Sequence, residues 1–436
     1  MKERYESYKD SGVPWIGQVP QGWEVRRIAY AYAENTKQNT TLEKTEAYQF
    51  NYGTLIKKSR KYDESVDSDV YSRYTIFSPD DIVINGLNLN YDFVSQRVAI
   101  AQTEGIITSA YVCITPRENI HSPYFCYLFK AMDAMKLFHG MGTGIRLTLS
   151  YDELKKQPIP LPPLPEQRAI AGYLDARCAA IDAYVSSLER EAGLARELKQ
   201  AVIARAVTRG LDPNTPMRDS GIPWIGQVPQ GWEVVKTLYC LSMPITDGPH
   251  TTPELFAEGV PFVSAEAVSC GNGVIDFNHI RGYISQSFYE ECCKKYIPQI
   301  DDIYMIKSGA TTGKVAIVDT DRVFTIWSPL AVFRANKVRM LPRFLFYVLQ
   351  SDFYQLQVQL GWTFGTQQNI GMRTLESLKI PLPPLPEQRA IAAYLDQRCA
   401  AIDAYVASLD REAALVRELK QREIADAVTG KVRVAG

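Results

Sequence analysis

The sequence predicts an α+β fold in which two similar α/β domains are separated by two long antiparallel helices. Residues 159–200 recur almost unchanged at residues 380–421. Residues 10–25, DSGVPWIGQVPQGWEV, recur at residues 219–234. The middles between these repeats differ in most side chains. The chain is therefore two copies of one unit, related by an internal pseudo-two-fold axis, with fixed ends and a variable middle.

The repeats divide the chain into four segments. We expect variable domains at residues 1–158 and 211–379, and helical segments at residues 159–210 and 380–436. A chain of 436 residues is long enough for two or three cores. It contains no long apolar window for a membrane span, and its first residues, MKERYESYKD, are charged. We therefore expect a cytoplasmic protein.

Charge and cysteine content restrict the class of function. The net charge is −1 at pH 7, whereas a protein that binds nucleic acid unaided is usually basic. If DNA is the ligand, positive charge must be clustered locally or supplied by a partner. The 8 cysteines are scattered without zinc-type spacing, so we expect reduced, mostly buried thiols.

The first middle mixes strand and helix patterns. Apolar runs at residues 81–85, 98–101 and 110–115 predict strands, and residues 123–138 have helical spacing after an N-terminal proline. Segment 10–25 is rich in Pro, Gly and Trp and predicts an ordered loop. The second middle echoes the first, for example where Asp301-Asp302-Ile303 matches Asp80-Asp81-Ile82. The two middles therefore share a fold while presenting different surfaces.

Each helical segment begins with a stiff proline stretch, IPLPPLP, and continues as a heptad pattern with charged flanks. This pattern predicts a coiled coil in which the two helices pack against each other, antiparallel because a two-fold axis relates them. The predicted seam consists of Leu174, Cys178, Ile181, Val185, Leu188, Leu395, Cys399, Ile402, Val406 and Leu409, with alanines and Val416 continuing it.

A second apolar stripe lies off the seam on both helices. It contains Ile170, Tyr173, Tyr184, Leu194, Leu198, Ile391, Tyr394, Tyr405, Leu415 and Leu419. Two interpretations remain open for it: contact with the variable domains of the same chain, or a binding surface for a partner protein.

No group of residues predicts catalysis. GATTGKV at residues 309–315 lacks the spacing of a phosphate-binding loop and carries Val315 after the lysine, so we expect a loop between strands. GMGTG at residues 140–144 follows a predicted helix, where a dinucleotide site needs a strand. The four histidines show no metal spacing. The Asn/Asp-Pro-Pro-aromatic tetrapeptide of amino-methyltransferases does not occur.

Polar side chains suited to DNA contact gather in both middles. Amides, hydroxyls and cations can bind base edges and phosphates, although each residue alone is equally compatible with an ordinary polar surface. The candidates are Lys57, Lys58, Arg60, Asn85, Asn88, Asn90, Arg97, Arg146, His250, Thr251, Thr252, Lys307, Thr311, Thr312, Lys314, Gln367, Gln368 and Asn369.

Two variable domains separated by duplicated PLPPLPEQRAIA segments resemble the specificity (S) subunit of type I restriction-modification enzymes. The stretches TDGPHTTPE, DIVINGLNLNYDFVSQRVAI and SGATTGKVAI are similar to stretches of that family's target recognition domains. The resemblance covers essentially the whole chain.

The resemblance implies a non-catalytic subunit that binds double-stranded DNA. Each domain would read one half of a bipartite, interrupted site, and the helices would set the spacing. Two modification subunits carrying S-adenosylmethionine would dock on it, and restriction subunits using ATP and Mg²⁺ can then join. No cofactor is expected on this chain itself.

Two alternatives remain. The chain could be a nuclease or methyltransferase by itself, which methylation assayed with the chain alone would reveal. It could also be a coiled-coil scaffold that touches no DNA, which a DNA-binding test with the methyltransferase present would reveal.

Overall fold

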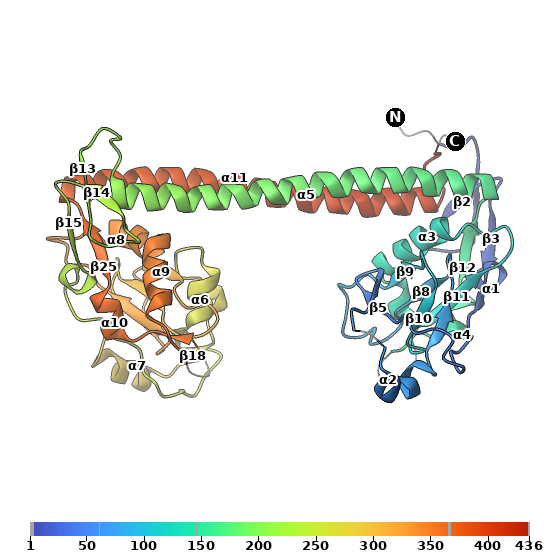
Figure 1. Cartoon of the computed structure of the whole chain (residues 1–436), viewed down its shortest axis with the longest axis horizontal. Helices are drawn as coiled ribbons and strands as arrows, with labels where there is room; N and C mark the ends of the chain where they lie inside the picture. The colour runs from blue at the N-terminus through green and yellow to red at the C-terminus, as the bar shows by residue number, and fades with distance from the viewer. Residues whose placement is uncertain (1–3, 61, 143, 145–146, 365–367, 435–436) are drawn as a thin grey trace. The chain divides into compact units, whose positions relative to one another are not determined.

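The computed structural model describes residues 4–60, 62–142, 144, 147–364 and 368–434. It divides into two compact units: unit 1 contains residues 1–189 and 411–436, and unit 2 contains residues 190–410. This division cuts across both long helices, whereas the sequence pattern suggested boundaries at the helix ends. The reason is that each helix begins in one unit and ends in the other (Figure 1).

The variable domain of unit 1 is built from short strands and one longer helix, α3. Its elements are β1 Tyr8–Asp10, β2 Gln18–Pro20, β3 Glu24–Arg27, α1 Ile28–Ala31, β4 Tyr32–Glu34, β5 Tyr48–Asn51, β6 Thr54–Lys57, α2 Glu64–Tyr71, β7 Thr75–Phe77, β8 Ile82–Ile84, β9 Val98–Ile100, β10 Gly105–Ile107, β11 Val112–Pro116, α3 Ser122–Ala134, a 3-10 turn Leu137–Gly140, α4 Tyr151–Leu154 and β12 Pro158–Leu161. The predicted loop at residues 10–25 is in part a hairpin, because β1 pairs antiparallel with β2.

A four-stranded antiparallel sheet, ordered β4-β11-β8-β9, forms the centre of unit 1. The predicted strands at residues 81–85, 98–101 and 110–115 correspond to β8, β9 and β11. Helix α3 covers this sheet, with Phe125 and Phe129 fully buried in the core. The predicted helix 123–138 ends earlier, because Lys136 adopts a left-handed conformation with φ of 60°.

Unit 2 repeats this arrangement. Its elements are β13 Met217–Asp219, β14 Gln227–Pro229, β15 Glu233–Lys236, a 3-10 turn Thr237–Cys240, β16 Thr246–Asp247, β17 Val260–Val263, α6 Ala265–Cys270, a 3-10 turn Phe277–His279, β18 Tyr283–Ile284, α7 Gln286–Cys293, β19 Ile303–Ile306, β20 Val315–Ile317, β21 Thr325–Ile326, β22 Leu330–Phe333, α8 Pro342–Gln350, α9 Asp352–Leu360, β23 Thr363–Phe364, β24 Gln368–Asn369, α10 Met372–Ser377 and β25 Lys379–Leu382. The sheet order β16-β22-β19-β20 matches β4-β11-β8-β9 of unit 1.

The repeated Asp-Asp-Ile sequences have a structural role in both sheets. In each copy the first aspartate adopts a positive φ, 69° at Asp80 and 76° at Asp301. The second aspartate is buried and accepts a hydrogen bond from the backbone of the preceding turn, Ser78 N to Asp81 Oδ2 at 3.0 Å and Gln299 N to Asp302 Oδ2 at 2.8 Å. The motif therefore closes the turn before β8 and β19.

The proline stretch and the Gly-Trp-Glu-Val stretch meet in each unit. In unit 1, β12 pairs antiparallel with β3, and the Trp23 indole donates a hydrogen bond of 2.8 Å to Glu166. The fully buried Gln167 amide donates to the Pro162 carbonyl at 2.9 Å and accepts from the His121 amide, at the start of α3, at 2.9 Å. We call this set of contacts the junction of unit 1.

The junction of unit 2 is made by the equivalent residues. Strand β25 pairs with β15, and the Trp232 indole donates to Glu387. The buried Gln388 amide donates to the Pro383 carbonyl at 2.8 Å and accepts from the Leu341 amide, at the start of α8, at 2.8 Å. Both copies of the Pro-Glu-Gln sequence therefore fasten the domain to the first turn of a long helix.

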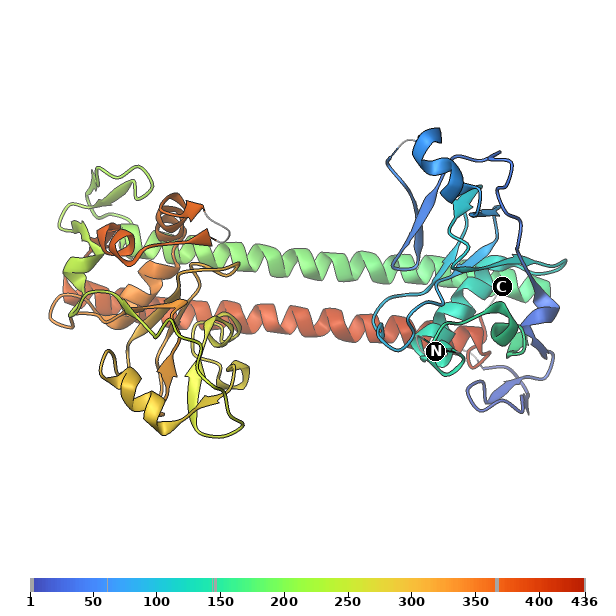
Figure 2. The same ribbon diagram turned by 90° about the horizontal axis from the view of Figure 1, so that it is seen from below.

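Two long helices follow the junctions: α5 spans Leu164–Arg209 and α11 spans Leu385–Val428. They lie side by side within each unit (Figure 2). In unit 1, Arg177 pairs with Glu423 and Asp182 pairs with Lys420, both between 2.7 and 2.8 Å. The partner numbers fall as the α5 numbers rise, so the predicted antiparallel packing is confirmed there.

Unit 2 repeats the second of these pairs with the roles of the helices exchanged. Lys199 of α5 binds Asp403 of α11 at 2.7 Å, the counterpart of Lys420 and Asp182. The ten leucine, cysteine, isoleucine and valine positions named for the predicted seam up to Leu188 and Leu409 are buried, with relative exposures from 0% at Leu174 and Leu395 to 9% at Val406, whereas Val416 beyond them is half-buried. Exposed ion pairs contribute little energy each, so the seam holds the helices together and the pairs fix their register.

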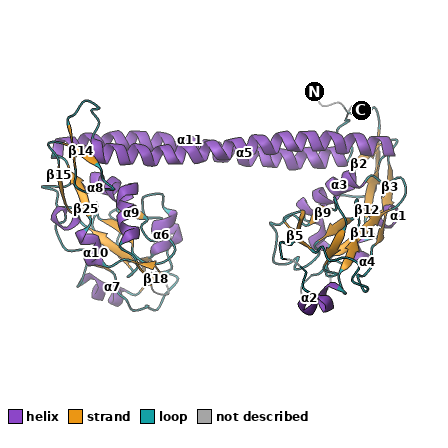
Figure 3. Cartoon of the chain, in the orientation of Figure 1, coloured by secondary structure: helices purple, strands orange, loops and turns teal. Residues whose placement is uncertain are grey.

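The end of each helix packs on the unit that the other helix begins in. Ile424, Ala427 and Val428 of α11 belong to the core of unit 1, and the Val428 carbonyl accepts a hydrogen bond of 2.9 Å from Tyr124. Ile203, Ala206 and Val207 of α5 occupy the equivalent place in the core of unit 2. Helix α3 of unit 1 thus lies between the sheet and the helix pair (Figure 3).

We predict that Gln167→Leu destabilises unit 1 by about 2–4 kcal/mol, because the leucine leaves the Pro162 carbonyl and the His121 amide buried without partners. Thermal unfolding followed by circular dichroism measures the change. Gln18→Leu, an exposed position of the same unit, serves as the control and should be nearly neutral. Equal unfolding temperatures for the two variants would contradict the role given to the junction.

We also predict that a circular permutant, opened in the exposed Asp212–Asn214 turn and joined through a short linker between the present ends, keeps its fold. Tyr5 and Arg433 line one surface groove of unit 1, so the described ends lie close together. The unfolding midpoint should match that of the parent within a few degrees in the same circular dichroism experiment. Loss of the cooperative transition would contradict this prediction and show that the connection after α5 cannot be exchanged for one after α11.

Candidate nucleic-acid interface

Eight of the candidate residues lie on two loops that follow equivalent strands. In unit 1 the loop between β8 and β9 contains residues 85–97, and in unit 2 the loop between β19 and β20 contains residues 307–314. The prediction that GATTGKV is a loop between strands is therefore confirmed. The framework that carries the two loops is shared, while the loops have different lengths and side chains.

Three predicted segments of unit 2 meet at Lys307. The Ile370 amide donates to the Lys307 carbonyl at 2.9 Å, and Ser308 forms an isolated antiparallel bridge with Asn369. The Lys307 ammonium lies 3.3 Å from Asp247, in the segment TDGPHTT. Residues far apart in sequence thus form one surface of unit 2.

Asp247 is the charged centre of this surface. Its side chain is 1% exposed, and Lys295 binds it at 2.5 Å and His250 at 3.1 Å. Burial by itself would raise the pKa of Asp247, but the ammonium groups of Lys295 and Lys307 together hold it below its usual value. The sequence pattern did not relate Asp247 to Lys295, because nothing local connects a lysine just after α7 with a strand 48 residues earlier.

Glycine is required beside this carboxylate. A Cβ atom at Gly248 would lie 2.0 Å from the Ile326 carbonyl oxygen, so the strand end can approach only with glycine there. The following residues His250, Thr251 and Thr252 are exposed. The close approach therefore turns the segment outward at the point where its polar side chains begin.

The other candidates of unit 2 differ in accessibility. Lys314 is exposed and donates weakly to the Ser269 carbonyl at 3.4 Å. Thr311 and Thr312 are half-buried, and the Thr312 hydroxyl donates to the Gly309 carbonyl at 2.7 Å. Lys307, with a side chain only 12% exposed, mainly neutralises Asp247.

The last three candidates of unit 2 are only partly visible. Asn369 is exposed. Gln368 is described only as a backbone position in β24. Gln367 lies outside the described residues.

In unit 1, Asn88 is exposed with a positive φ of 52°, and Asn85 and Asn90 are half-buried. The segment after α3 lies beside them, because the Leu149 amide donates to the Gly86 carbonyl at 2.9 Å and the Leu89 amide to the Leu147 carbonyl at 3.1 Å. Arg146 of this segment lies outside the described residues.

Arg97 does not fit the prediction that it contacts DNA. Its side chain is 1% exposed, and its guanidinium donates to the carbonyls of Asn85, Leu87 and Asp92 at 2.7 to 3.0 Å. Both terminal nitrogens of the guanidinium bind carbonyls of the β8–β9 loop, so Arg97 fixes the shape of this loop. Its sequence position beside an Asn-rich segment gave no indication of burial.

The basic run of unit 1 lies on β6 and the segment after it, where its charges have partners of their own. Lys57 pairs with Glu46 at 2.5 Å, and Arg60 lies 3.3 Å from Asp67. Lys58 sits over the Tyr74 ring, 5.5 Å from its centre. These exposed ion pairs are weak and leave Lys57 and Arg60 accessible. The acidic partners nevertheless offset part of the positive charge of the run.

The stripe off the helix seam is partly exposed. Ile170 and Ile391 are fully buried in the cores of the units, so they do not belong to a partner surface. Tyr173 is half-buried, and the remaining seven side chains are 41% to 59% exposed: Tyr184, Leu194, Leu198, Tyr394, Tyr405, Leu415 and Leu419. In unit 2, Leu194, Leu198 and Tyr405 line a shallow groove of about 390 Å³. We call the eight positions other than Ile170 and Ile391 the helix stripe.

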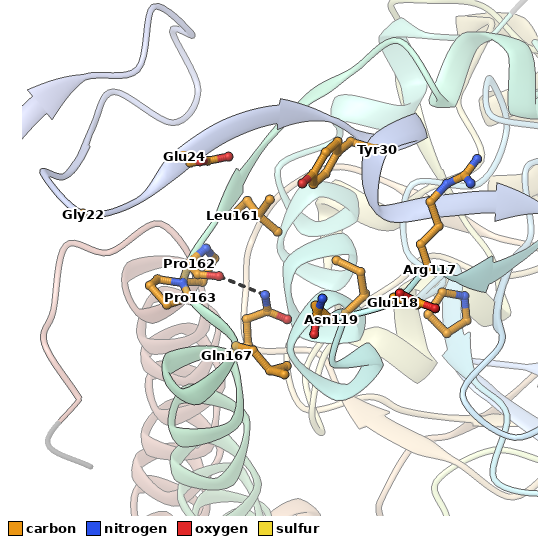
Figure 4. A pocket seen from close by; sticks show the side chains of 13 residues that line it. Gly22, Glu24, Tyr30, Arg117, Glu118, Asn119, Leu161, Pro162, Pro163 and Gln167 are labelled. Atoms are coloured by element: carbon orange, nitrogen blue, oxygen red, sulfur yellow. Dashed lines mark hydrogen bonds between the residues drawn. The ribbon is translucent and has the colours of Figure 1, made fainter.

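A larger groove of about 830 Å³ lies at the junction of unit 1, between the proline stretch and the turn before α3 (Figure 4). Tyr30 stands at its edge with 56% of its side chain exposed, and Gln167 lies at its base. The equivalent Tyr239 of unit 2 is 55% exposed. Each unit therefore has an exposed tyrosine beside its junction.

The described residues contain no cluster of three or more His, Cys, Asp or Glu side chains suited to a metal ion. No helix among them combines the length and apolar character that a membrane crossing requires. The eight cysteines are unpaired thiols, and only Cys270 is exposed.

We predict that Asp247→Asn destabilises unit 2 by about 3 kcal/mol at pH 7, because Lys307 is left buried without its carboxylate. The folded pKa of Asp247 is lowered, so its contribution is complete above the unfolded pKa near 4 and is lost as the pH falls through the lower folded value. Thermal unfolding at pH 7 and in acid should therefore show the two proteins converging in acid. A constant difference at every pH would contradict this assignment.

Comparison with known proteins identifies this architecture. A family model described as type I restriction modification DNA specificity domain matches residues 21–183 and 250–404. The putative type I restriction enzyme MjaX specificity subunit of Methanocaldococcus jannaschii is 25% identical over 435 residues, covering 96% of both chains. The MjaVIII specificity subunit of the same organism is 24% identical, covering 95% of this chain and 94% of the relative.

Solved structures have the same fold. A chain from a structural study of complex assembly and conformational transition of the type I R-M system superposes with a TM-score of 0.71 at 19% identity, covering 94% of this chain and 98% of that one. The HsdS subunit of Thermoanaerobacter tengcongensis gives 0.52 at 20% identity, covering 95% and 98%. Because the family model matches most of the chain, in one stretch for each variable domain, the chain belongs to the type I restriction modification DNA specificity family.

Proposed function

We propose that this chain is the DNA-reading subunit of a type I restriction-modification complex and that each unit reads one half of an interrupted site. The observation that carries the proposal is the contrast between the two units. The junction contacts, the turns before β8 and β19 and the Lys–Asp pair between the helices occur in both units, while the β8–β9 and β19–β20 loops differ. A duplicated scaffold with unlike loops is suited to reading two unlike half-sites.

The chain acts without a catalytic site of its own, and the methyl donor S-adenosylmethionine is carried by the modification subunits. Restriction subunits, where present, supply ATP and Mg²⁺. The net charge of −1 supports this division of labour, since nonspecific DNA affinity comes largely from cations that neutralise phosphates. We therefore propose that the partners supply most of the phosphate contacts. A protein that works on genomic DNA in this way acts in the cytoplasm.

The helix stripe is the proposed docking surface for the modification subunits. Tyr184, Leu194 and Leu198 on α5 correspond to Tyr405, Leu415 and Leu419 on α11, and all six are exposed. Within unit 2, Leu194, Leu198 and Tyr405 line one groove, and Tyr184, Leu415 and Leu419 are the equivalent residues of unit 1. Exposed apolar side chains grouped in this way suit a helix of a partner protein. Because one such surface occurs in each unit, we propose two modification subunits for each chain.

The long helices set the distance between half-sites in this proposal. Helix α5 has 46 residues and α11 has 44, which at a rise of about 1.5 Å per residue is about 65–70 Å. Half-sites read from one face of DNA recur every ~34 Å. The spacer in the DNA site should therefore depend on helix length, and the bases on either side of it should not.

The first test exchanges the reading surface of unit 2. The chain is co-expressed with a type I methyltransferase subunit that binds it, and methylated adenines are mapped by single-molecule sequencing. We expect a two-part motif, of which replacing residues 235–379 by the corresponding segment of another family member changes one part only. A motif unaffected by the exchange, in a complex that still assembles, would leave the chain a scaffold; methylation by the chain alone would make it an enzyme.

The second test lengthens the helices. Three heptads are inserted between Glu189 and Arg190 and three more at the matching point between Asp410 and Arg411, so that the antiparallel seam stays in register. These 21 residues add about 31 Å to each helix, close to one turn of DNA, so the spacer should grow by about nine base pairs while both half-sites keep their sequence. An insertion in α5 alone is the control and should disrupt assembly. An unchanged spacer in the doubly lengthened protein would contradict the proposal.

A further inference from the structure

The tip of the β8–β9 loop in unit 1 exposes apolar side chains that the sequence pattern did not single out. Tyr91 is 77% exposed, Val94 is 90% exposed and Phe93 is 54% exposed. They lie directly after the Asn-rich segment that ends at Asn90. Exposure of apolar side chains to water is unfavourable, and groups of exposed apolar side chains commonly mark a binding surface.

This loop is braced from inside. Three backbone carbonyls of the loop accept hydrogen bonds from the buried Arg97 guanidinium, as described above. The Arg97 amide and the Gln96 side chain both donate to Asp133 at 2.8 Å. The loop is thus attached to α3 at its base, and the position of its tip is set in advance of any contact.

The polar groups near the tip point back into the loop. The Asp92 carboxylate accepts hydrogen bonds from the amides of Val94 at 3.1 Å and Ser95 at 3.0 Å, and the Ser95 amide, together with the Arg97 charge, lowers the pKa of Asp92 to about 2. The Lys136 ammonium donates to the Phe93 carbonyl. The Asp92 and Lys136 side chains are therefore engaged with the backbone of the loop, while Tyr91 and Val94 stand at the surface.

Comparison of the two units favours DNA over a protein as the occupant. Surfaces for a partner that binds both halves should be duplicated, as the helix stripe and the Tyr30 and Tyr239 positions are. The β8–β9 tip has no such copy, because the β19–β20 loop carries Thr311, Thr312 and Lys314 instead. A surface that differs between the two units suits contact with half-sites of different sequence.

We propose that Tyr91 and Val94 read thymine methyl groups in the major groove of the half-site bound by unit 1, and that Arg97 is the positioning residue that presents them. An apolar side chain distinguishes thymine by its 5-methyl group, the only apolar group that the major-groove edge of a base pair offers. A rigid loop loses little conformational entropy on binding, so it can discriminate a single methyl group. This inference rests on the proposed function.

The test replaces thymine by uracil, which removes only the methyl group. Duplexes carrying the mapped motif, with uracil at one thymine at a time, are titrated against the complex with its methyltransferase. For at least one thymine in the half-site of unit 1 we expect about four-fold weaker binding, the loss that corresponds to one buried methyl group. Uracil in the half-site of unit 2 serves as the internal control.

Variants then assign the effect. Tyr91→Ala and Val94→Ala, both at exposed positions that do not support the core, should bind thymine and uracil duplexes equally. Val338→Ala, an 81% exposed valine of unit 2, should keep the discrimination. Arg97→Met should lose the discrimination while unit 1 still assembles with the methyltransferase. If Arg97→Met fails to fold, the two exposed variants decide the question.

Three results would overturn the inference. One is a half-site for unit 1 that contains no A·T pair. Another is equal binding of every uracil duplex by the parent protein. The third is a loss of methyltransferase assembly without DNA in Tyr91→Ala or Val94→Ala, which would make the tip a protein interface. If no two-part motif is found at all, the proposed function fails instead.

Discussion

A buried glutamine at the start of each long helix fixes how that helix is attached to the variable domain of its unit. Gln167 and Gln388 lie where the proline stretch becomes helix, and each joins a proline carbonyl to the first turn of the helix that covers the sheet. Buried amides of this kind are costly to leave unpaired, so the contact specifies one geometry. The neighbouring glutamates add a second fixed point through the indoles of Trp23 and Trp232.

The helix pair gives the chain its circular organisation. The core of unit 1 contains the end of α11, and the core of unit 2 contains the end of α5. Unit 1 is assembled from two stretches of sequence, whereas unit 2 is one continuous stretch that begins within α5. Each unit thus contains the last turns of the helix that begins in the other. Ion pairs such as Lys199 with Asp403 and Lys420 with Asp182 are exchanged by the same symmetry.

Against this fixed scaffold, the two loops at equivalent strand ends differ in chemistry. The loop of unit 2 is polar and adjoins the buried Asp247 with its cations, while the loop of unit 1 exposes Tyr91 and Val94 over a framework held by Arg97. One fold thus carries an electrostatic surface and an apolar one. Divergence at the exposed positions of the loops costs little stability, whereas Leu89 and Arg97 of the unit 1 loop are buried.

The sequence by itself determined the duplication, the antiparallel seam, the strands β8, β9 and β11 and the family. These are properties of periodicity and repetition, which are written along the chain. Tertiary structure alone decided which polar residues are accessible. Arg97 reads as a surface cation but is buried, Ile170 and Ile391 share the period of the helix stripe but face the cores, and Asp247 meets Lys295 across 48 residues. Burial of a side chain depends on neighbours distant in sequence, so local pattern could not reveal it.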